Sequence, residues 1–183
     1  PRAFLAAKQE AKVSFGDDRV YMERFIKNPR HVEVQILADS YGNVLHLGDR
    51  DCSLQRRNQK ILEEARCAFL DEDVRQRMYE TSVNLAKHVH YEGVGTLEYL
   101  VEPSGAFYFM EMNTRIQVEH PITELVSGVN LLQEQIRVAY GERLNLRQED
   151  IVFRGHALEC RINAENVQQN FRPSPGTIDA LLI

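Results

Sequence analysis

Three stretches of the chain place apolar side chains three or four positions apart, the spacing that predicts an amphipathic helix. They are residues 2–15, 71–90 and 122–140. Gly16 follows the first stretch and Gly141 follows the third, and glycine is the residue that most often ends a helix. We therefore expect three helices, each burying one face.

Shorter stretches alternate apolar and polar residues, the period of a β-strand with one buried face. These stretches are 19–26, 31–38, 44–47, 96–101, 107–113 and 155–163. Turn-forming residues at 39–43 and 103–105 join neighbouring stretches as hairpins. Because hairpins connect antiparallel strands, the pattern predicts an antiparallel sheet with helices packed on one side, an α+β fold.

One polar segment fits neither period. Residues 49–60 are dense in charge and carry Arg56, Arg57 and Lys60. Such a segment is typical of a loop that is either functional or disordered. A lid that faces an anion and a plain solvated loop both remain open. A nucleic-acid patch is disfavoured, because acidic residues flank the cations and no aromatic residues lie between them.

A second polar row lies within 109–120. If this stretch runs extended, one face carries Glu111, Asn113, Arg115, Gln117 and Glu119. Each of these groups is costly to bury without a partner. We interpret the row as a site for a charged ligand. The alternative is a solvated strand face that carries surface ion pairs.

The second predicted hairpin brings two carboxylates together. If Glu102 pairs with Phe107, Glu98 lies directly opposite Glu111, where like charges repel. A cation between them would remove the repulsion, and Asn113 offers a third oxygen on the same face. Oxygen ligands alone favour magnesium or manganese, and magnesium completes its shell with phosphate oxygens, which indicates ATP. A register shifted by one residue would turn Glu98 to the other face.

Composition narrows the classes of function. A formal net charge of −5 and a pI near 5.7 argue against broad binding to nucleic acids or membrane surfaces. No apolar run approaches the roughly 18 residues of a membrane span. The three cysteines are scattered and fit a reducing compartment better than a zinc site. Because the chain starts at Pro1 and stops within the apolar run 180–183, we expect a piece of a longer protein.

Several blocks of the sequence resemble the biotin carboxylases, which are ATP-grasp enzymes. Residues 109–116 are similar to the second ATP-binding motif of that superfamily, and 117–121 extend the likeness to biotin carboxylase itself. Further blocks that resemble the family are 30–35, 50–60 and 154–165. The resemblance implies an ATP-grasp fragment divided into a remnant of the small lobe (1–26), the main lobe (27–150) and the start of the C-terminal domain (151–183).

The resemblance also implies a role for each matching position. The magnesium or manganese on ATP would be held by Glu98, Glu111 and Asn113. The adenine and ribose site would be lined by Glu23, the backbone near Ile26, His31, Gln55, Asn58 and Leu100. Bicarbonate would contact Lys60, Arg115, Gln117 and Val118. Glu119 would be the general base that deprotonates bicarbonate, and Arg161 would stabilise the enolate of biotin.

The implied reaction is the ATP-dependent carboxylation of biotin by bicarbonate through carboxyphosphate. It is the first half-reaction of acetyl-CoA carboxylase and related carboxylases. The implied partners are a biotin carboxyl carrier protein, a carboxyltransferase and a second copy in a homodimer, with no nucleic acid and no membrane. The implied location is the cytoplasm, or the mitochondrion in a eukaryote. The isolated piece is expected to be inactive, because it has no glycine-rich phosphate loop.

Two departures and two alternatives accompany the resemblance. Arg24 stands where the family often has lysine, and Asn58 stands where some members have histidine. One alternative is another ATP-grasp ligase, of the carbamoyl-phosphate or purine-pathway type. The other is a non-catalytic interaction module on the same fold.

Overall fold

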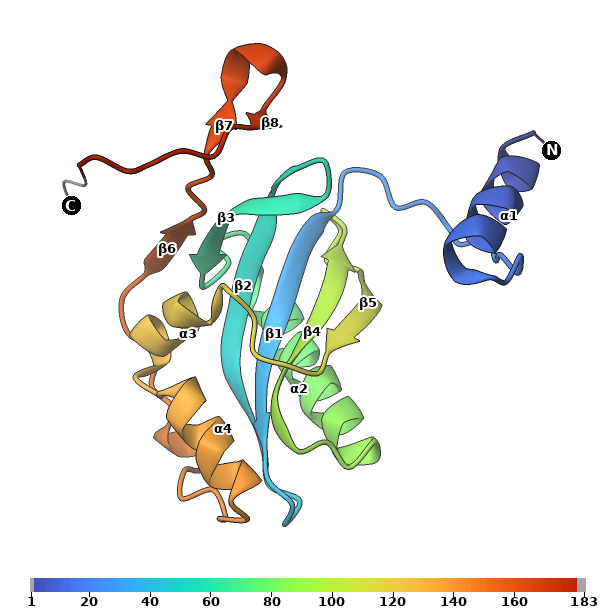
Figure 1. The fold of residues 1–183 in the computed structure, drawn as a ribbon. Coiled ribbons are helices and arrows are strands. Elements are labelled where there is room, and N and C mark those ends of the chain that lie inside the picture. Colours follow the sequence, from blue (N-terminus) through green and yellow to red (C-terminus); the bar gives the residue numbers. More distant parts are fainter. Residues whose placement is uncertain (1, 181–183) are drawn as a thin grey trace.

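The computed structural model describes residues 2–180, and its centre is a six-stranded sheet (Figure 1). The strand order is β5-β4-β1-β2-β3-β6, and every neighbouring pair is antiparallel. The strands are β1 (Arg30–Ala38), β2 (Val44–Arg56), β3 (Gln59–Ala65), β4 (Gly93–Val101), β5 (Phe107–Asn113) and β6 (Ala157–Cys160). The predicted antiparallel sheet of an α+β fold is confirmed.

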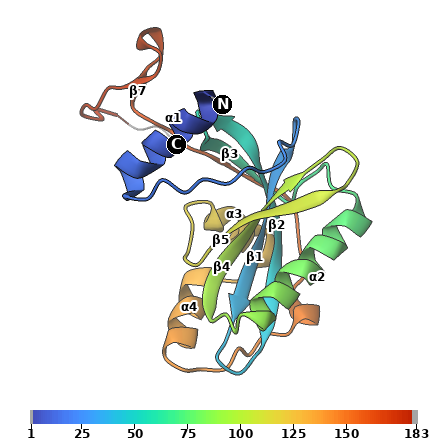
Figure 2. The ribbon, with the colours of Figure 1, turned by 90° about the vertical axis from the view of Figure 1, so that its right-hand side faces the viewer.

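Helices cover both faces of this sheet, whereas the sequence predicted one covered face. Helix α2 (Glu72–His88) packs on β1 and β2 from one side, which we call the α2 face. Helices α3 (His120–Ser127) and α4 (Leu131–Ala139) lie on the opposite side, which we call the site face (Figure 2). The prediction was wrong because hairpin connections fix strand direction and leave open which face a later helix covers.

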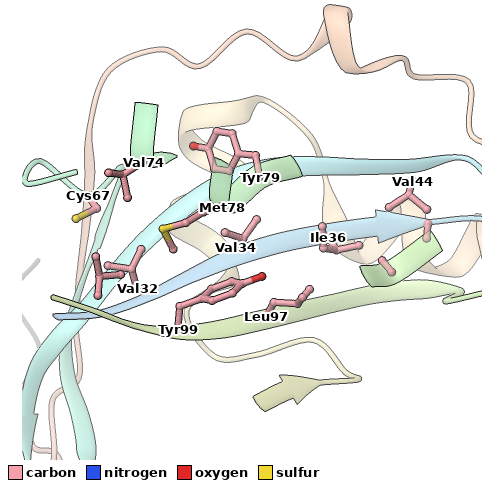
Figure 3. Close-up of a cluster of buried hydrophobic side chains, with 13 residues drawn as sticks. Val32, Val34, Ile36, Val44, Cys67, Val74, Met78, Tyr79, Leu97 and Tyr99 are labelled. Carbon is pink, nitrogen blue, oxygen red and sulfur yellow. The ribbon is translucent and has the colours of Figure 1, made fainter. Parts of the chain in front are cut away.

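The α2 face holds the main hydrophobic core (Figure 3). Val34 and Ile36 from β1 and Leu97 and Tyr99 from β4 meet Met78 of α2, and all five are at most 1% exposed. Fully burying side chains of this size stabilises the fold by roughly 1.5–3 kcal/mol each. The alternation predicted for 31–38 is confirmed, since the even-numbered residues of β1 face this core.

The site face changes character along β1. At one end Leu37 packs with Leu131 and Val138 of α4. At the other end Glu33 and Gln35 occupy the same face, at 0% and 1% exposure. The site face of β1 therefore has an apolar end, which packs against α4, and a polar end. The buried polar groups at that end need hydrogen-bond or ion-pair partners.

Several predicted elements have different bounds. Residues 19–26 form no strand, although their polar and apolar residues alternate. Tyr21, Met22 and Phe25 are 83%, 88% and 84% exposed, so the segment does not pair with the sheet. The predicted helix 122–140 is split into α3 and α4 by Gly128, whose φ of +71° favours glycine. The predicted strand 155–163 is limited to β6. Helix α1 (Arg2–Phe15) is confirmed, but the expectation that it buries one face is wrong, because none of its residues is buried.

The segment 49–60 is a β-hairpin and not a loop. Residues 49–56 complete β2, and β3 returns after the tight turn at Arg57 and Asn58, whose φ angles are +53° and +62°. Positive φ at both central residues matches the turn that joins twisted hairpin strands, and asparagine adopts it readily. The strand was missed because both its faces are covered and its buried positions are charged, which removes the alternation.

The remaining structure is short. It comprises the 3-10 helices η1 (Gln148–Asp150) and η2 (Val167–Gln169) and a small ladder between β7 (Glu165–Asn166) and β8 (Arg172–Pro173). Among residues 2–180, no helix has the length and apolar character needed to cross a membrane. Pro1 and residues 181–183, on which the expectation of a longer protein was based, lie outside the described residues.

Candidate functional site

A pocket of about 610 Å³ opens at the polar end of the site face. We call it the site pocket. Its lining consists of every predicted site residue except Glu23 and Ile26, together with Pro29, Ser53, Gln59 and Met110. Residues that are up to 132 positions apart in the sequence, from Pro29 to Arg161, thus share one cavity.

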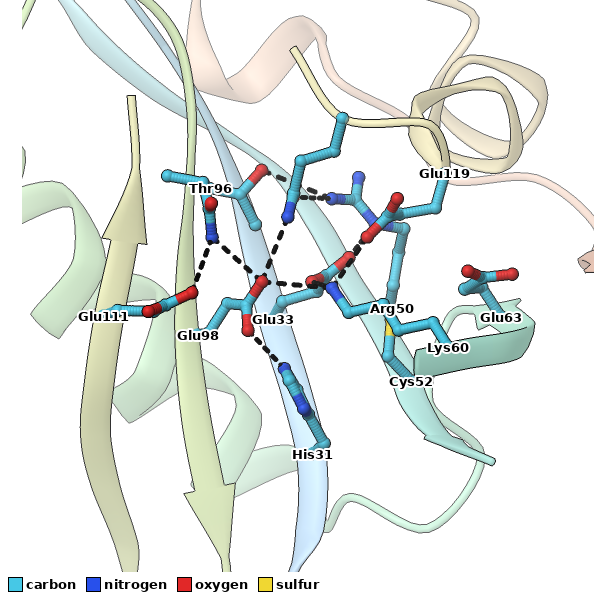
Figure 4. A network of polar contacts seen from close by, with 12 residues as sticks. His31, Glu33, Arg50, Cys52, Lys60, Glu63, Thr96, Glu98, Glu111 and Glu119 are labelled. Atoms are coloured by element: carbon cyan, nitrogen blue, oxygen red, sulfur yellow. Dashed lines mark hydrogen bonds and ion pairs between the residues drawn. The ribbon is translucent and has the colours of Figure 1, made fainter. Parts of the chain in front are cut away.

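Lys60 lies at the centre of the polar groups in this pocket (Figure 4). Its Nζ donates to Glu33 Oε2 at 2.6 Å, to Glu119 Oε1 at 2.7 Å and to Glu98 Oε1 at 3.0 Å. Burial by itself would lower the pKa of Lys60, but the charge of Glu33 and the hydrogen bonds outweigh it and raise that pKa. Lys60 is therefore a fixed positive charge shared by three carboxylates.

Arg50 is a second buried cation and lies beneath the pocket. Its side chain is fully buried, and Nε donates to Glu33 Oε1 at 2.5 Å. One terminal nitrogen donates to Gln35 and Thr123 at 2.7 and 2.8 Å, and the other lies 3.3 Å from the amide oxygen of Gln117. Arg50 connects β1, β2 and α3, so it fixes the floor on which the pocket residues stand.

His31 and Gln55 orient Glu98 from the other side. The Gln55 amide nitrogen donates to the carbonyl of Cys52 at 2.8 Å and lies 2.9 Å from His31 Nδ1. Because that amide nitrogen is a donor, His31 Nδ1 accepts from it, and the other ring nitrogen, Nε2, lies 2.6 Å from Glu98 Oε2. Burial would raise the pKa of Glu98, but the hydrogen bond from His31 and the charge of Lys60 lower it to about 2. Glu98 is therefore held ionised.

The predicted pairing of Glu98 with Glu111 is confirmed, although the predicted register at the turn is wrong. Next to the turn Val101 pairs with Phe107, one residue away from the predicted partner. A β-bulge between Tyr99 and Glu98 shifts the register by one and restores the Glu98–Glu111 pair. The bulge also turns Met110 into the site pocket, where strict alternation had placed it on the other face.

Asn113 lies between the two carboxylates. Its side-chain nitrogen donates to Glu98 Oε1 at 3.0 Å and to Glu111 Oε1 at 3.4 Å. Turning the amide by 180° would present its oxygen to the same place. Glu111 is exposed and faces the pocket. These three oxygen donors fit a magnesium or manganese ion in chemistry and in placement.

Two other groups of potential ligands converge in the same region. One is His31, Glu33 and Glu98, and the other is Glu33, Cys52 and Glu119. Their carboxylates already share the ammonium group of Lys60, so a further cation there would meet that positive charge. Burial also raises the pKa of the Cys52 thiol, which disfavours the thiolate that a metal would need. Glu98 contacts that ammonium as well, so the set around Glu111 differs in one respect: Glu111 is not among the carboxylates that Lys60 contacts.

Glu119 and Arg161 form the far wall of the pocket. Arg161 donates from a terminal nitrogen to Glu119 Oε2 at 2.8 Å and from Nε to Glu63 Oε1 at 2.6 Å. Burial would raise the pKa of Glu119, but the hydrogen bond and charge of Lys60 lower it overall. In this arrangement Glu119 is an ionised acceptor held between two cations.

The extended row predicted over 109–120 ends at Asn113. Residues 114–119 form a turn that leads into α3. Gln117 and Glu119 are nevertheless buried in the pocket, at 5% and 2% exposure. Arg115 is exposed and donates to the carbonyl of Ile116 at 3.1 Å. The prediction that these side chains gather at one site holds for their placement, but a loop brings them there and not a strand.

Two predicted site residues lie away from the pocket. Glu23 is exposed on the segment that follows α1, and Ile26 is buried at 8% exposure. Neither lines the site pocket. Both belong to the stretch that was predicted as a strand and lacks one, so their placement beside a nucleotide stays a prediction.

Sequence reasoning missed three buried residues of the site. Glu33 shares the face of His31, so the alternation of β1 carried a usable signal for it. Arg50 and Glu63 flank the hairpin turn that was read as a loop. Their partners lie far away in the sequence, such as Arg161 for Glu63, and no spacing rule connects them.

Known proteins match the chain in sequence and in structure. The family model for the ATP-binding domain of the carbamoyl-phosphate synthase L chain matches residues 1–147. A biotin carboxylase from Nostoc sp. is 61% identical over 181 residues, which is 99% of this chain and 40% of that relative. A biotin carboxylase–beta-gamma-ATP complex from Campylobacter jejuni has a TM-score of 0.92 at 51% identity, covering 98% of this chain and 40% of that one.

A further solved structure is the biotin carboxylase domain of 2-oxoglutarate carboxylase from Hydrogenobacter thermophilus. It is a dimer in complex with MgADP, ADP and bicarbonate, with a TM-score of 0.89 at 47% identity, covering 97% of this chain and 41% of that one. The chain thus spans about two fifths of the length of the relatives that it matches. The resemblance to biotin carboxylase drawn from the motifs is confirmed, and so is the ATP-grasp fold. The chain belongs to the family of the carbamoyl-phosphate synthase L chain ATP-binding domain, and biotin carboxylases are among its relatives.

Proposed function

We propose that a protein containing this chain carboxylates biotin with bicarbonate at the expense of ATP. The observation that carries the proposal is the gathering of Glu98, Glu111 and Asn113 in one pocket with Lys60, Glu119 and Arg161. The first group offers oxygen ligands for a metal–nucleotide complex. The second offers cations for an anion and a carboxylate that can accept its proton.

The nucleotide end of the pocket is the side of Glu98 and Glu111. Glu98, Glu111 and Asn113 would hold magnesium or manganese, which would supply positive charge to offset the charge of the γ-phosphate. His31 keeps Glu98 oriented by the 2.6 Å contact between Nε2 and Oε2. In our proposal adenosine lies along Gln55, Asn58 and Leu100, with Glu23 and Ile26 adding contacts from the preceding segment.

The bicarbonate end is the side of Lys60 and Glu119. Bicarbonate would be held by Lys60, by Arg115 and by the backbone and side chains of residues 117–118. A bicarbonate ion at Lys60 competes with Glu119 for its donors. Losing part of that stabilisation raises the proton affinity of Glu119 and frees an oxygen to take the bicarbonate proton. The deprotonated anion attacks the γ-phosphate and gives carboxyphosphate and ADP.

The last step uses Arg161. Carboxyphosphate decomposes into carbon dioxide and phosphate, and phosphate takes the ureido proton of biotin. The guanidinium of Arg161 would stabilise the enolate that this leaves, and carbon dioxide then adds to the biotin nitrogen. Arg161 is suited to the task because two carboxylates hold its guanidinium against the pocket wall.

The wider biology remains part of the proposal. We assign 1–26 to the small lobe, 27–150 to the main lobe and 151–183 to the start of the C-terminal domain. Biotin would arrive on a carrier protein, and a carboxyltransferase would pass the carboxyl group on. A homodimer and a cytoplasmic location accord with the domain dimer of the Hydrogenobacter relative and with the bacterial relatives. An acetyl-CoA carboxylase is the proposed assembly.

The test is ATP cleavage by the full-length protein with bicarbonate, with and without free biotin. We expect biotin to stimulate cleavage, and carboxybiotin to form in step with ADP. Cleavage that needs bicarbonate and ignores biotin would favour a ligase of the carbamoyl-phosphate type. An ATPase rate unchanged by Glu111→Gln would favour a non-catalytic module. The isolated 183-residue chain should not turn over.

A further inference from the structure

Glu63 is a buried acid that the proposed reaction does not use. Its side chain is 0% exposed, and Oε1 accepts a hydrogen bond from Arg161 Nε at 2.6 Å. Its other oxygen, Oε2, is buried and has no hydrogen-bond partner among the described residues. A buried carboxylate with one unsatisfied oxygen is costly, so the position is poorly explained by stability alone.

Among residues 2–180, the one hydrogen-bond partner of the Glu63 side chain is Arg161, a residue of the site pocket. Glu63 does not line the pocket, whereas Arg161 and Glu119 do. The guanidinium of Arg161 is held at two points, by Glu63 at Nε and by Glu119 at a terminal nitrogen. The arginine backbone is fixed to the same strand as Glu63, because Arg161 N donates to the carbonyl of Ile61 at 3.0 Å. Glu63 can therefore act on the chemistry only through Arg161.

A competing carboxylate lies close by. Glu159 is the direct partner of Glu63 in the β3–β6 ladder and precedes Arg161 by two residues. It is only half-buried, so an ion pair with Arg161 would cost less desolvation there. Among the described residues, the Arg161 side chain nevertheless donates its hydrogen bonds to Glu63 and Glu119. The arginine thus pairs with a buried carboxylate although one that would cost less to pair with is close by.

Electrostatics adds to the cost of this arrangement. Burial raises the pKa of Glu63, the charge of Arg161 lowers it, and the charges of Glu119 and Glu159 raise it again, with a net upward shift. Figure 4 shows Glu63 on β3 beside Glu119. The cost of burying Glu63 without a full set of hydrogen-bond partners is understandable if the function of Glu63 is to orient Arg161.

We propose that Glu63 is a positioning residue whose carboxylate holds the Nε of Arg161, so that the terminal nitrogens face Glu119 and the site pocket. The proposal deepens the proposed function and rests on it, since a fixed guanidinium matters there for the enolate of biotin. Partners of this kind, which orient a functional group without touching the substrate, commonly change activity about 10- to 100-fold when they are removed.

The kinetic test compares Glu63→Ala, Glu63→Gln and the matched control Glu159→Gln in the full-length protein. Glu63→Ala should lower kcat for biotin-dependent ATP cleavage by about 10- to 100-fold and leave KM for ATP within about two-fold. Glu63→Gln keeps an acceptor oxygen and should recover most of that loss. Glu159→Gln should stay within about two-fold of wild type. Equal losses in the two positions, or a rise in KM for ATP that matches the fall in kcat, would overturn the proposal.

A crystal structure of the Glu63→Ala protein gives a second readout that does not depend on activity. We expect Arg161 to leave hydrogen-bond distance of Glu119 while β3 and β6 keep their places. Arg161 remaining on Glu119 would overturn the positioning role, even in a protein that carboxylates biotin. If wild type shows no biotin-dependent cleavage, the proposed function fails and the crystal structure alone decides the role of Glu63. Should Glu63→Ala not fold, Glu63→Asp, one methylene shorter, replaces it in both measurements.

Discussion

The two faces of the sheet are built from alternate residues of the same strands and behave in opposite ways. On β1, Val32 and Val34 face α2 in the apolar core, while Glu33 and Gln35 lie on the site face and accept hydrogen bonds from Arg50. Apolar burial is non-directional and stabilises the fold in proportion to area. Buried ion pairs add little net stability, yet removing one partner is strongly destabilising. The α2 face therefore supplies folding free energy, and the site face supplies fixed geometry.

Polar groups on the two faces differ in their balance of charge. On the α2 face, Asp49 accepts from Tyr79, from Arg75 at 3.0 Å and from the Cys67 backbone at 2.7 Å, which satisfies the acid within the fold. On the site face, Lys60 contacts three carboxylates, each of which has a further partner in Arg50, Arg161 or His31. Glu111 stands near Glu98 with only an amide between them and has no cation of its own among the described residues. A face with surplus acid is prepared for an added cation, and a closed network is not.

The largest expected effect comes from removing the shared cation. Lys60→Met leaves Glu33, Glu98 and Glu119 buried near one another, and the free energy of unfolding at pH 7 should fall by about 3–5 kcal/mol. Urea denaturation of the chain measures it. The exposed Lys27→Met is the matched control and should change stability by no more than about 0.5 kcal/mol. Similar values for both would remove the distinction between the faces.

A cavity in the core of the α2 face should destabilise the fold slightly less than Lys60→Met does, and it should leave the site pocket intact. Met78 is 0% exposed, and Met78→Ala should lower the free energy of unfolding by about 3 kcal/mol, from lost burial and a residual void. Nucleotide affinity of the full-length variant should stay within about two-fold of wild type. Glu80→Ala, on the exposed side of the same helix, is the control. A large loss of affinity in Met78→Ala would show that the faces are coupled.

The two faces should lose stability in different pH ranges, and a residue on the α2 face, His46, should respond first as the pH falls. Burial and the charge of Arg66 lower the pKa of His46, which stacks on Tyr79, from 6.5 to about 4. Between these values the unfolded chain binds the proton and the folded chain does not, so stability falls as pH decreases from 6.5 to 4. The expected loss is about 2 kcal/mol, reduced from the full linkage value for partial exposure.

The site face responds at lower pH. The pKa of Glu98 is lowered to about 2, so the stability it contributes is present above 4.5 and is lost as pH falls toward 2. Denaturation of His46→Phe should therefore lack the slope between pH 6.5 and 4 and retain the slope below 4.5. An unchanged slope in the upper range would contradict the assignment to His46.

The smallest effect concerns the apolar end of the site face. Asn130 caps α4, and its side-chain oxygen accepts from Gln133 N at 2.8 Å. Asn130→Ala should lower the free energy of unfolding by about 1 kcal/mol. Gln133→Ala keeps the backbone donor and is the control. Equal changes in the two variants, measured by urea denaturation, would show that the cap does not fix α4.

Much of the fold followed from local periodicity, and the failures have a common cause. The alternation of β1 and the helical spacing of 2–15 are local properties, and both predictions are confirmed. Residues 49–56 were misread because a strand covered on both faces, with buried charges at Asp49, Arg50 and Asp51, loses its alternation. Residues 19–26 alternate without a partner strand. Periodicity reports what a segment is suited to, and neighbours decide whether it forms.

The site residues could be predicted from the sequence where they lie close together along the chain. Glu98 and Glu111 share one hairpin, so pairing could be counted from the turn, and the bulge that corrected the count left no mark in the sequence. Arg50 and Glu63 depend on partners across the fold, such as Thr123 and Arg161. No local rule joins such positions, and only the folded sheet reveals them.

The central claim is that Glu98 and Glu111 hold a divalent cation on a nucleotide. The most direct measurement is calorimetric titration of ADP into the full-length protein with and without Mg²⁺, for wild type, Glu111→Gln and the control Glu102→Gln near the turn of the same hairpin. The account predicts that Mg²⁺ tightens ADP binding by about ten-fold or more in wild type and in the control, and that Glu111→Gln loses this gain. A gain from Mg²⁺ that survives Glu111→Gln unchanged would contradict it.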